Sequence, residues 1–314
     1  MTRRPDRLTA EDSALTTNDG VLSSLIDTFP AFLAYWGEVR GRPLEEQVAR
    51  WASDYLAPWP ELLAKQTADY AAQGLDWAAV ARERVFAAFD ERLPLMEEAH
   101  RNLLRACGPT LRRAGRVLGW QGEVTLVIHV GIGCGAGWVT TDDGLPAILF
   151  GLENVAECGW SDAAAIAGLV AHECGHLVHG GWRRAAGRAR GSGPWWRLYE
   201  EGFAQRCEVL LEGEEACHQA QSSGGEWLQW CRCHEAWLAA EFLRAVDAGD
   251  SVTAFFGSWL NVRGHSETGY YLGARALSML EETLGLRGAA LREDAEGCLR
   301  PILERMRSSG GPGD

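Results

Sequence analysis

The stretch His172-Glu173-Cys174-Gly175-His176 decides the expected fold, because it places two imidazoles and one carboxylate within a single short segment. On a helix, side chains four residues apart lie about 40° from each other around the axis, so His172 and His176 can reach one ion. Glu173 is rotated by about 100° from His172, which sets its carboxylate beside the ion, where it can act on water. The spacing therefore predicts a zinc site on a helix.

The segment around the motif has the features of a helix from about Ala163 to His179. It is rich in alanine and carries apolar side chains at helical spacing. Ser161 or Asp162 can cap its start, and Gly180-Gly181 supplies a stop. A second helix is expected from near Trp195 to Leu211.

Zinc in a catalytic site takes three protein ligands and leaves a further position to water. The metzincin pattern would require glycine at position 179 and histidine at position 182, whereas this chain has His179 and Trp182. The third ligand must therefore come from elsewhere. The best candidate is a carboxylate within Tyr199-Glu200-Glu201-Gly202-Phe203-Ala204-Gln205, on the second expected helix.

The two segments together resemble a known family. His172-Glu173-x-x-His176 followed by Glu201-Gly202-Phe203-Ala204 is similar to the gluzincin metallopeptidases, whose third ligand is the glutamate of an E-G-x-A stretch. More closely, the chain resembles a bacterial family of predicted zinc-dependent proteases with this two-helix site. The resemblance covers roughly Gly122 to Leu211, with a looser likeness around Gly269-Tyr270-Tyr271-Leu272-Gly273.

The resemblance implies that Glu201, rather than Glu200, completes the zinc site with the two histidines. We therefore expect one Zn²⁺ per chain and a zinc-dependent peptidase whose substrate is a peptide or protein. Glu173 is the expected general base, which takes a proton from water and passes it to the leaving amine. The glycine at 202 would let the two zinc-ligand helices approach each other closely.

A peptidase also needs a hydrogen-bond donor for the oxyanion that develops on the scissile carbonyl. Tyr270, Tyr271 and His265 follow a glycine-flanked break that can turn one of them toward the metal. By family resemblance we favour Tyr271 over Tyr270. The alternative is that both tyrosines are core residues of a helix.

The chain departs from the family in two places. Thermolysin-type members have an acidic residue one turn after the ligand glutamate to orient a metal-bound histidine, but here that position is Gln205, and Glu208 lies a further turn along. Gly151-Leu152-Glu153-Asn154 echoes a segment that holds the substrate amine in aminopeptidases, but with Leu152 in place of methionine. We therefore expect endopeptidase or oligopeptidase action, with aminopeptidase action through Glu153 as the alternative.

Two other interpretations of the polar motifs remain open. The chain could be a catalytically silent zinc-binding domain that acts as a partner-binding module, although a purely structural site has no use for Glu173. Cys217-His218 and Cys231-Arg232-Cys233-His234 invite a second zinc site, but the C-x-C-H spacing is unusual for structural zinc. We interpret these cysteines as ordinary thiols.

Between Gly122 and Phe150 the pattern changes from helical to extended. Residues 123–130 are β-branched and partly alternating, which predicts a strand that enters a glycine loop at 131–137. No Gly-Lys-Ser/Thr follows this loop, so it does not match a phosphate loop. The turn signal Asp142-Asp143-Gly144 then predicts a hairpin, and with it a small mixed or antiparallel sheet.

The expected fold class is α+β and mostly helical, a zincin-like metallopeptidase core with a small sheet and two zinc-ligand helices, flanked by helical regions. The helical spacing begins at Val21. The expected organisation is a flexible leader at 1–20, an N-terminal helical region at 21–118, the catalytic core at 119–215, a C-terminal helical region at 216–306 and a flexible tail at 307–314.

Composition limits the partners and the compartment. The formal net charge of −13 over 314 residues disfavours nucleic acid and anionic membranes as partners, since such a surface repels phosphates. We find no signal-peptide core and no apolar run of the roughly 18 residues that span a bilayer. With nine cysteines, an odd number, we expect reduced thiols and a cytoplasmic protein, whose oligomeric state the sequence leaves open.

Overall fold

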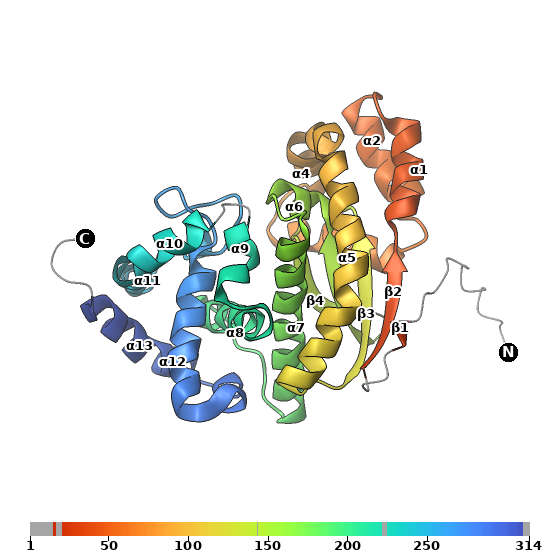
Figure 1. The fold of residues 1–314 in the computed structure, drawn as a ribbon. Helices are drawn as coiled ribbons and strands as arrows, with labels where there is room; N and C mark the ends of the chain where they lie inside the picture. The colour runs from red at the N-terminus through yellow and green to blue at the C-terminus, as the bar shows by residue number, and fades with distance from the viewer. Residues whose placement is uncertain (1–14, 17–20, 143, 222–224, 310–314) are drawn as a thin grey trace. The chain divides into compact units, whose positions relative to one another are not determined.

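The chain forms two compact units, each built from two separate stretches of sequence. A computed structural model describes residues 15–16, 21–142, 144–221 and 225–309. Unit 1 comprises Met1–Asp90 and Gln121–Glu153, and unit 2 comprises Glu91–Trp120 and Asn154–Asp314. The described part is mostly helical with a small mixed sheet, as the sequence predicts for an α+β protein (Figure 1).

Unit 1 contains the sheet, whose strands lie in the order β1-β2-β3-β5-β4. The pairs β2–β3 and β3–β5 are parallel, whereas β1 and β4 pair antiparallel at the two edges. Both parallel partners β3 and β5 become continuously buried toward their ends, which is typical of strands inside a parallel sheet. The strands are β1 (Leu15–Thr16), β2 (Val21–Asp27), β3 (Gly122–His129), β4 (Gly137–Asp142) and β5 (Leu145–Gly151).

The predicted strand and hairpin are both confirmed. The strand predicted at 123–130 is β3, and β4 pairs antiparallel with β5, with Asp142 opposite Leu145 at the turn. Asp143, at the centre of that turn signal, lies outside the described residues.

The start of the predicted N-terminal helical region is wrong, because Val21–Asp27 is strand β2. This strand is made by a partner distant in sequence, since Val21 pairs with Gly122 and the Ser24 hydroxyl donates to Thr125 Oγ1 at 3.1 Å. Local spacing cannot reveal such pairing. The helical pattern begins instead at Phe29, the first residue of the helix that follows.

The rest of unit 1 is helical up to residue 90. Its helices are α1 (Phe29–Val39), α2 (Leu44–Arg50), α3 (Pro60–Ala72) and α4 (Trp77–Val80), with π-helical turns at Trp51–Tyr55 and Ala81–Val85 and a 3-10 turn at Phe86–Ala88. The long helix α5 (Phe89–Leu118) begins at the end of this stretch.

The structure describes only part of the predicted leader and of the predicted tail. Within the leader expected at 1–20, residues 15–16 form β1, and the other residues lie outside the described part. Within the tail expected at 307–314, residues 307–309 continue the last helix, and residues 310–314 lie outside the described part.

The regular elements of unit 2 among the described residues are helices, apart from an isolated β-bridge between Val262 and His265. Two short 3-10 turns, at Glu214–Ala216 and Thr253–Phe255, interrupt them. After α5 the helices are α6 (Leu152–Glu157), α7 (Ala163–Ala185), α8 (Pro194–Glu212), α9 (His218–Gln221), α10 (Glu226–Cys233), α11 (Glu235–Ala248), α12 (Thr268–Ala290) and α13 (Ala295–Ser309).

The two predicted motif helices are α7 and α8. Asp162 caps α7, because its Oδ1 accepts the backbone N–H groups of Ala164 and Ala165 at 2.8 and 3.0 Å. The predicted stop at Gly180-Gly181 is wrong, since α7 continues to Ala185. The continued turn is held by Arg183, whose guanidinium donates to three backbone carbonyl groups, those of Ala189, Ala290 and Arg292.

Helix α8 lies between α7 and α12, and glycines set both contacts (Figure 1). A Cβ atom at Gly175 on α7 would lie 2.7 Å from Ala204 Cα on α8. A Cβ atom at Gly202 on α8 would lie 2.5 Å from the carbonyl carbon of Gly273 on α12. The prediction that Gly202 lets the two motif helices approach each other is therefore wrong, because Gly202 faces α12 and it is Gly175 that allows the close approach of α7 and α8.

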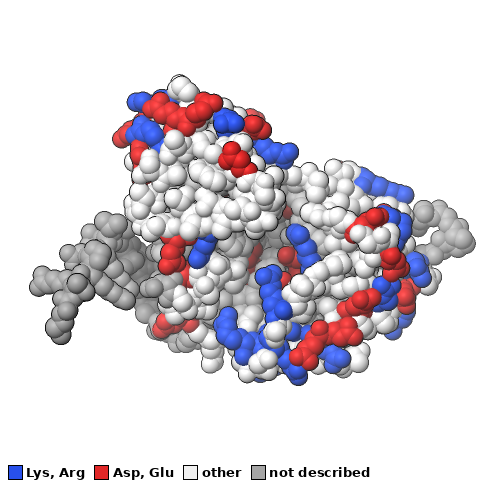
Figure 2. Space-filling view, turned by 180° about the vertical axis from the view of Figure 1, so that it is seen from behind, with Lys and Arg blue, Asp and Glu red and all other residues white. Residues whose placement is uncertain are grey.

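The surface carries both signs of charge. Figure 2 shows acidic and basic side chains interspersed on the face that it draws. In the part of the chain that the structure describes, no helix combines the length and the apolar character needed to cross a membrane.

Candidate metal centre

The residues predicted to hold zinc converge in unit 2. Helix α7 presents His172 and His176, and α8 presents Glu201. The Oε2 atom of Glu201 lies 3.1 Å from Nε2 of His176 and 3.5 Å from Nε2 of His172. These three ligand atoms lie within 4.8 Å of one another, so they form a group that could hold a metal ion.

The distances suit zinc. With zinc–ligand bonds of about 2.0–2.1 Å, two ligand atoms on a tetrahedral ion lie about 3.3 Å apart. The measured separations of 3.1 and 3.5 Å fall on either side of this value. The side chains of His176 and Glu201 are 15% and 19% exposed, so this group is partly accessible to solvent.

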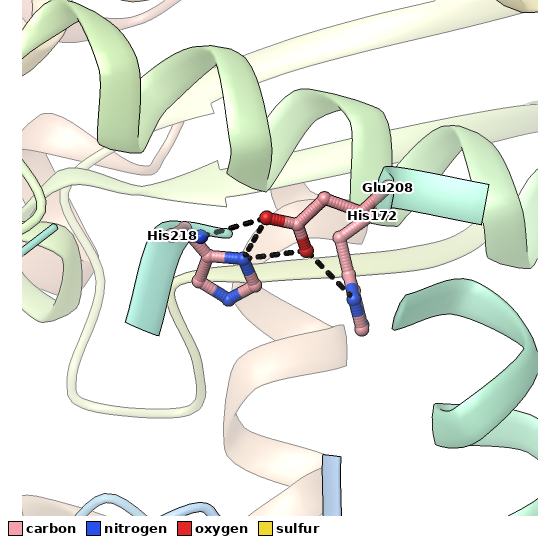
Figure 3. Close-up of side chains that lie close together, drawn as sticks. All are labelled: His172, Glu208 and His218. Atoms are coloured by element: carbon pink, nitrogen blue, oxygen red, sulfur yellow. Dashed lines mark hydrogen bonds and ion pairs between the residues drawn. The ribbon is translucent and has the colours of Figure 1, made fainter. Parts of the chain in front are cut away.

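A second carboxylate lies on the other edge of the His172 ring (Figure 3). Oε2 of Glu208 is 3.6 Å from Nδ1 of His172, a buried atom that has no hydrogen bond. Glu208 also accepts from His218, at 2.7 Å from its backbone N–H and at 2.9 Å from Nδ1. Carboxylates in this position orient a metal-bound histidine and fix its tautomer.

His172, Glu208 and His218 also form a group that could hold a metal ion. Their side chains are at most 4% exposed, and the Glu208 carboxylate already accepts the amide of Gln205 at 2.8 Å. This group is closed, and its carboxylate is occupied by donors. Of the two groups, the one with His176 and Glu201 is therefore the more accessible.

The histidines and carboxylates of this group shift one another's pKa values. Burial alone would lower the pKa of His172, but the nearby carboxylates of Glu201 and Glu208 and the charge of Glu173 outweigh burial and raise the pKa to about 10. Burial would raise the pKa of Glu201, but the charge of His176 and the hydrogen bonds from both histidines hold it below its usual range. A metal ion replaces protons on such groups, because ligands bind it deprotonated.

Glu173 lies on the same helix and is buried, at 3% exposure. Its Oε2 atom has no hydrogen-bond partner among the described residues. Burial raises the pKa of this carboxyl, although the charges of His176 and His172 oppose the shift. A buried carboxylate with a free oxygen beside the metal group has the properties of a proton acceptor.

The three candidate oxyanion donors lie in different surroundings. The Tyr270 ring centroid is 5.5 Å from that of His172, and the Tyr270 hydroxyl makes no hydrogen bond with a described residue. Tyr271 instead donates to Glu235 Oε2 at 2.7 Å, and His265 stacks on Trp230 with 4.0 Å between ring centroids. Of the two tyrosines, Tyr270 lies next to the metal group, whereas the hydroxyl of Tyr271, the residue favoured from the sequence, is directed to Glu235.

Tyr270 remains a hydrogen-bond donor at neutral pH. Burial raises the pKa of its phenol well above the ordinary value, and the charges of Glu201 and Glu267 act in the same direction. A neutral phenol keeps its O–H proton, so it can donate to a developing negative charge.

Glu153 has a structural role in unit 1. Its side chain is buried, and its two oxygens accept the backbone N–H groups of Gly131 and Gly133 at 2.6 and 3.0 Å. The Glu153 carboxylate is therefore not exposed to solvent. A carboxylate that holds the glycine loop is already bonded on both oxygens.

The cysteine-rich segments do not form a metal site. Neither group of described residues that could hold an ion includes a cysteine. Cys217 and Cys231 are buried and Cys233 is exposed, and each is a free thiol. This agrees with their interpretation as ordinary thiols.

Sequence reasoning missed the role of His218 and left that of Glu208 undecided. Glu208 lies seven residues after Glu201, so both carboxylates occupy the same face of α8. That spacing is the signal that was available. His218 had no comparable signal, because it reaches Glu208 only through the turn between α8 and α9.

Comparisons of the chain with protein-family models, curated proteins and solved structures find no match. The assignment of the candidate site therefore depends on the geometry of its residues alone.

A matched pair of variants tests which carboxylate is the third ligand. We expect Glu201→Gln to lose the bound zinc, because an amide replaces an anionic ligand, whereas Glu200→Gln retains one zinc per chain. Glu200 is a suitable control because it lies next to Glu201 on α8 but pairs with Arg190 at 2.7 Å. Metal content after dialysis measures the result. Zinc retained in Glu201→Gln but lost in His218→Gln would assign the ion to the closed group instead.

Proposed function

We propose that this protein is a zinc-dependent peptidase with a zincin-like core, related to the gluzincin metallopeptidases. The observation that carries the proposal is the convergence of His172, His176 and Glu201 next to the unpartnered carboxylate of Glu173. A purely structural zinc site has no need of that buried carboxylate, since its own ligands close the coordination shell.

In this proposal His172, His176 and Glu201 hold one zinc ion. Bound zinc supplies a Lewis acid that polarises a carbonyl group and lowers the pKa of water. Glu173 takes the proton of the attacking water on its free Oε2 atom and delivers it to the leaving amine. Tyr270 donates its hydroxyl proton as a hydrogen bond to the oxyanion, and Glu208 keeps the His172 ring in position.

The substrate is a peptide or a protein. Aminopeptidase action through Glu153 would require that carboxylate to leave the N–H groups of Gly131 and Gly133. Two charge-assisted hydrogen bonds oppose this change. Their presence supports endopeptidase or oligopeptidase action. All nine cysteines are free thiols, which suits a reducing compartment such as the cytoplasm.

Hydrolysis of a mixed peptide library by the zinc-loaded protein tests the proposal. We expect cleavage that a zinc chelator abolishes and that added zinc restores, with one zinc ion per chain. Mass spectrometry of the products detects the cleaved bonds. One zinc ion per chain without cleavage of any peptide would favour the alternative, a catalytically silent zinc-binding domain that acts as a partner-binding module.

A further inference from the structure

A cavity of about 320 Å³ lies in unit 2. Its volume falls within the range of about 300–1,000 Å³ that is usual for ligand pockets. The residues that matter for its chemistry are Glu157, Trp160, Glu226, Trp227, His265 and Glu267.

The cavity adjoins the candidate metal centre. The Trp160 ring in its wall meets the His218 ring edge-on, with 4.5 Å between centroids, and His218 binds Glu208. Glu267 precedes α12 and lies three residues before Tyr270, whose ring is next to His172. A group bound in this cavity would therefore lie close to the metal group.

The residue of the cavity that points to a bound ligand is Glu267. It is 8% exposed, and its carboxylate makes no hydrogen bond or ion pair with any described residue. Its backbone is left-handed, with φ of 61°, a conformation that a residue other than glycine adopts at a cost. A buried carboxylate without a partner is unfavourable unless something supplies a counter-charge.

The described residues that line the cavity supply no positive counter-charge to Glu267. Glu157 is already paired with Arg92 at 2.7 Å, and Glu226 adds a further negative charge at the exposed rim. Neither lysine nor arginine occurs among the described residues that line the cavity. Burial raises the pKa of Glu267 to about 8, although the charge of His172 opposes the shift. A cation would favour the ionised form and remove this penalty.

We propose that the cavity binds the cationic side chain of an arginine or lysine residue of the substrate, with Glu267 as its counter-ion. Trp160 and Trp227 provide aromatic walls along which the aliphatic stem can pack. The identity of the substrate as a peptide rests on the proposed function, but the affinity of the cavity for a cation does not. The protein would then prefer peptides with a basic residue close to the scissile bond.

Binding of small probes tests the cavity without any need for hydrolysis. Calorimetry with the zinc-loaded protein would compare N-acetyl-arginine amide with N-acetyl-citrulline amide, its neutral isostere, and with leucinamide, which has only a free α-ammonium group. We expect the arginine probe to bind at least about tenfold more tightly than the citrulline probe. Glu267→Gln should abolish that difference, whereas Glu282→Gln, an exposed position on α12, should preserve it.

A second variant guards against an effect of folding alone. Asparagine tolerates the left-handed backbone, so Glu267→Asn should unfold at a temperature no lower than the wild type and yet lose the arginine preference. Equal binding of the arginine and citrulline probes would overturn the proposal. Tight binding of leucinamide that depends on Glu267 would overturn it in favour of an amine-terminus site. Arginine binding without peptide cleavage would count against the peptidase function only.

Discussion

Glu173→Gln is expected to lower the rate of peptide hydrolysis by about 10²–10⁴-fold while one zinc ion stays bound per chain. The amide has nearly the size of the carboxylate but cannot accept a proton from water. Glu173 is not one of the three residues that converge as a metal group, so its replacement leaves the ligand atoms in place. Initial rates on one peptide, together with the metal content of the same sample, measure both effects.

Glu200→Gln is the control for this experiment, because it removes a carboxylate that pairs with Arg190 instead of facing the metal group. Its rate should stay close to that of the wild type. Full activity in Glu173→Gln would remove Glu173 from the mechanism. Loss of zinc together with activity would instead make Glu173 a metal-supporting residue.

The second large effect concerns stability. We expect Gly202→Ala to lower the free energy of unfolding by about 1–3 kcal/mol, the cost of overpacking a close contact. The new methyl group would meet backbone atoms of Gly273 at 2.5–2.6 Å, and backbone cannot rotate away as a side chain can. Since Gly202 follows Glu201 directly, zinc affinity should fall as well. Chemical denaturation of the metal-free protein separates the two effects.

Gly180→Ala is the matched control on α7, because a Cβ atom there would meet nothing within 4 Å. Alanine is favoured over glycine in a helix interior by up to about 1 kcal/mol, so this variant should be more stable than the wild type. Equal stability changes in both variants would show that the α8–α12 contact tolerates a methyl group.

The sequence predicts the elements whose signals are local. Helix α7 has a capping residue at Asp162 and an alanine-rich, periodic interior, and α8 extends only one residue beyond each predicted end. The hairpin of β4 and β5 has its turn signal in the chain. Strand β2 has no such signal, because its partner β3 begins at Gly122. Its two serines weaken the apolar pattern of a buried strand, so tertiary contacts decide the pairing.

The candidate site divides in the same way. The spacing of His172 and His176 is local to one helix turn, so sequence alone places both rings on one face. The choice between Tyr270 and Tyr271 depends on the rotation of α12 against its neighbours, because adjacent side chains on a helix point about 100° apart. The contact of Glu208 with His218 depends on the path of the turn after α8. Neither of these can be obtained from periodicity.

The interleaved stretches of the two units have a consequence for biosynthesis and for truncation. Unit 1 needs β3 and β5 to complete its sheet, so it cannot finish folding until residues beyond Gly151 have left the ribosome. By then α5, which belongs mainly to unit 2, has already been synthesised, but α7 and α8 of the same unit have not. No single cut releases an intact unit. A fragment that carries only the metal-binding helices would therefore lack α5, and a fragment that ends before Gly122 would leave β2 as an unpaired edge prone to aggregation.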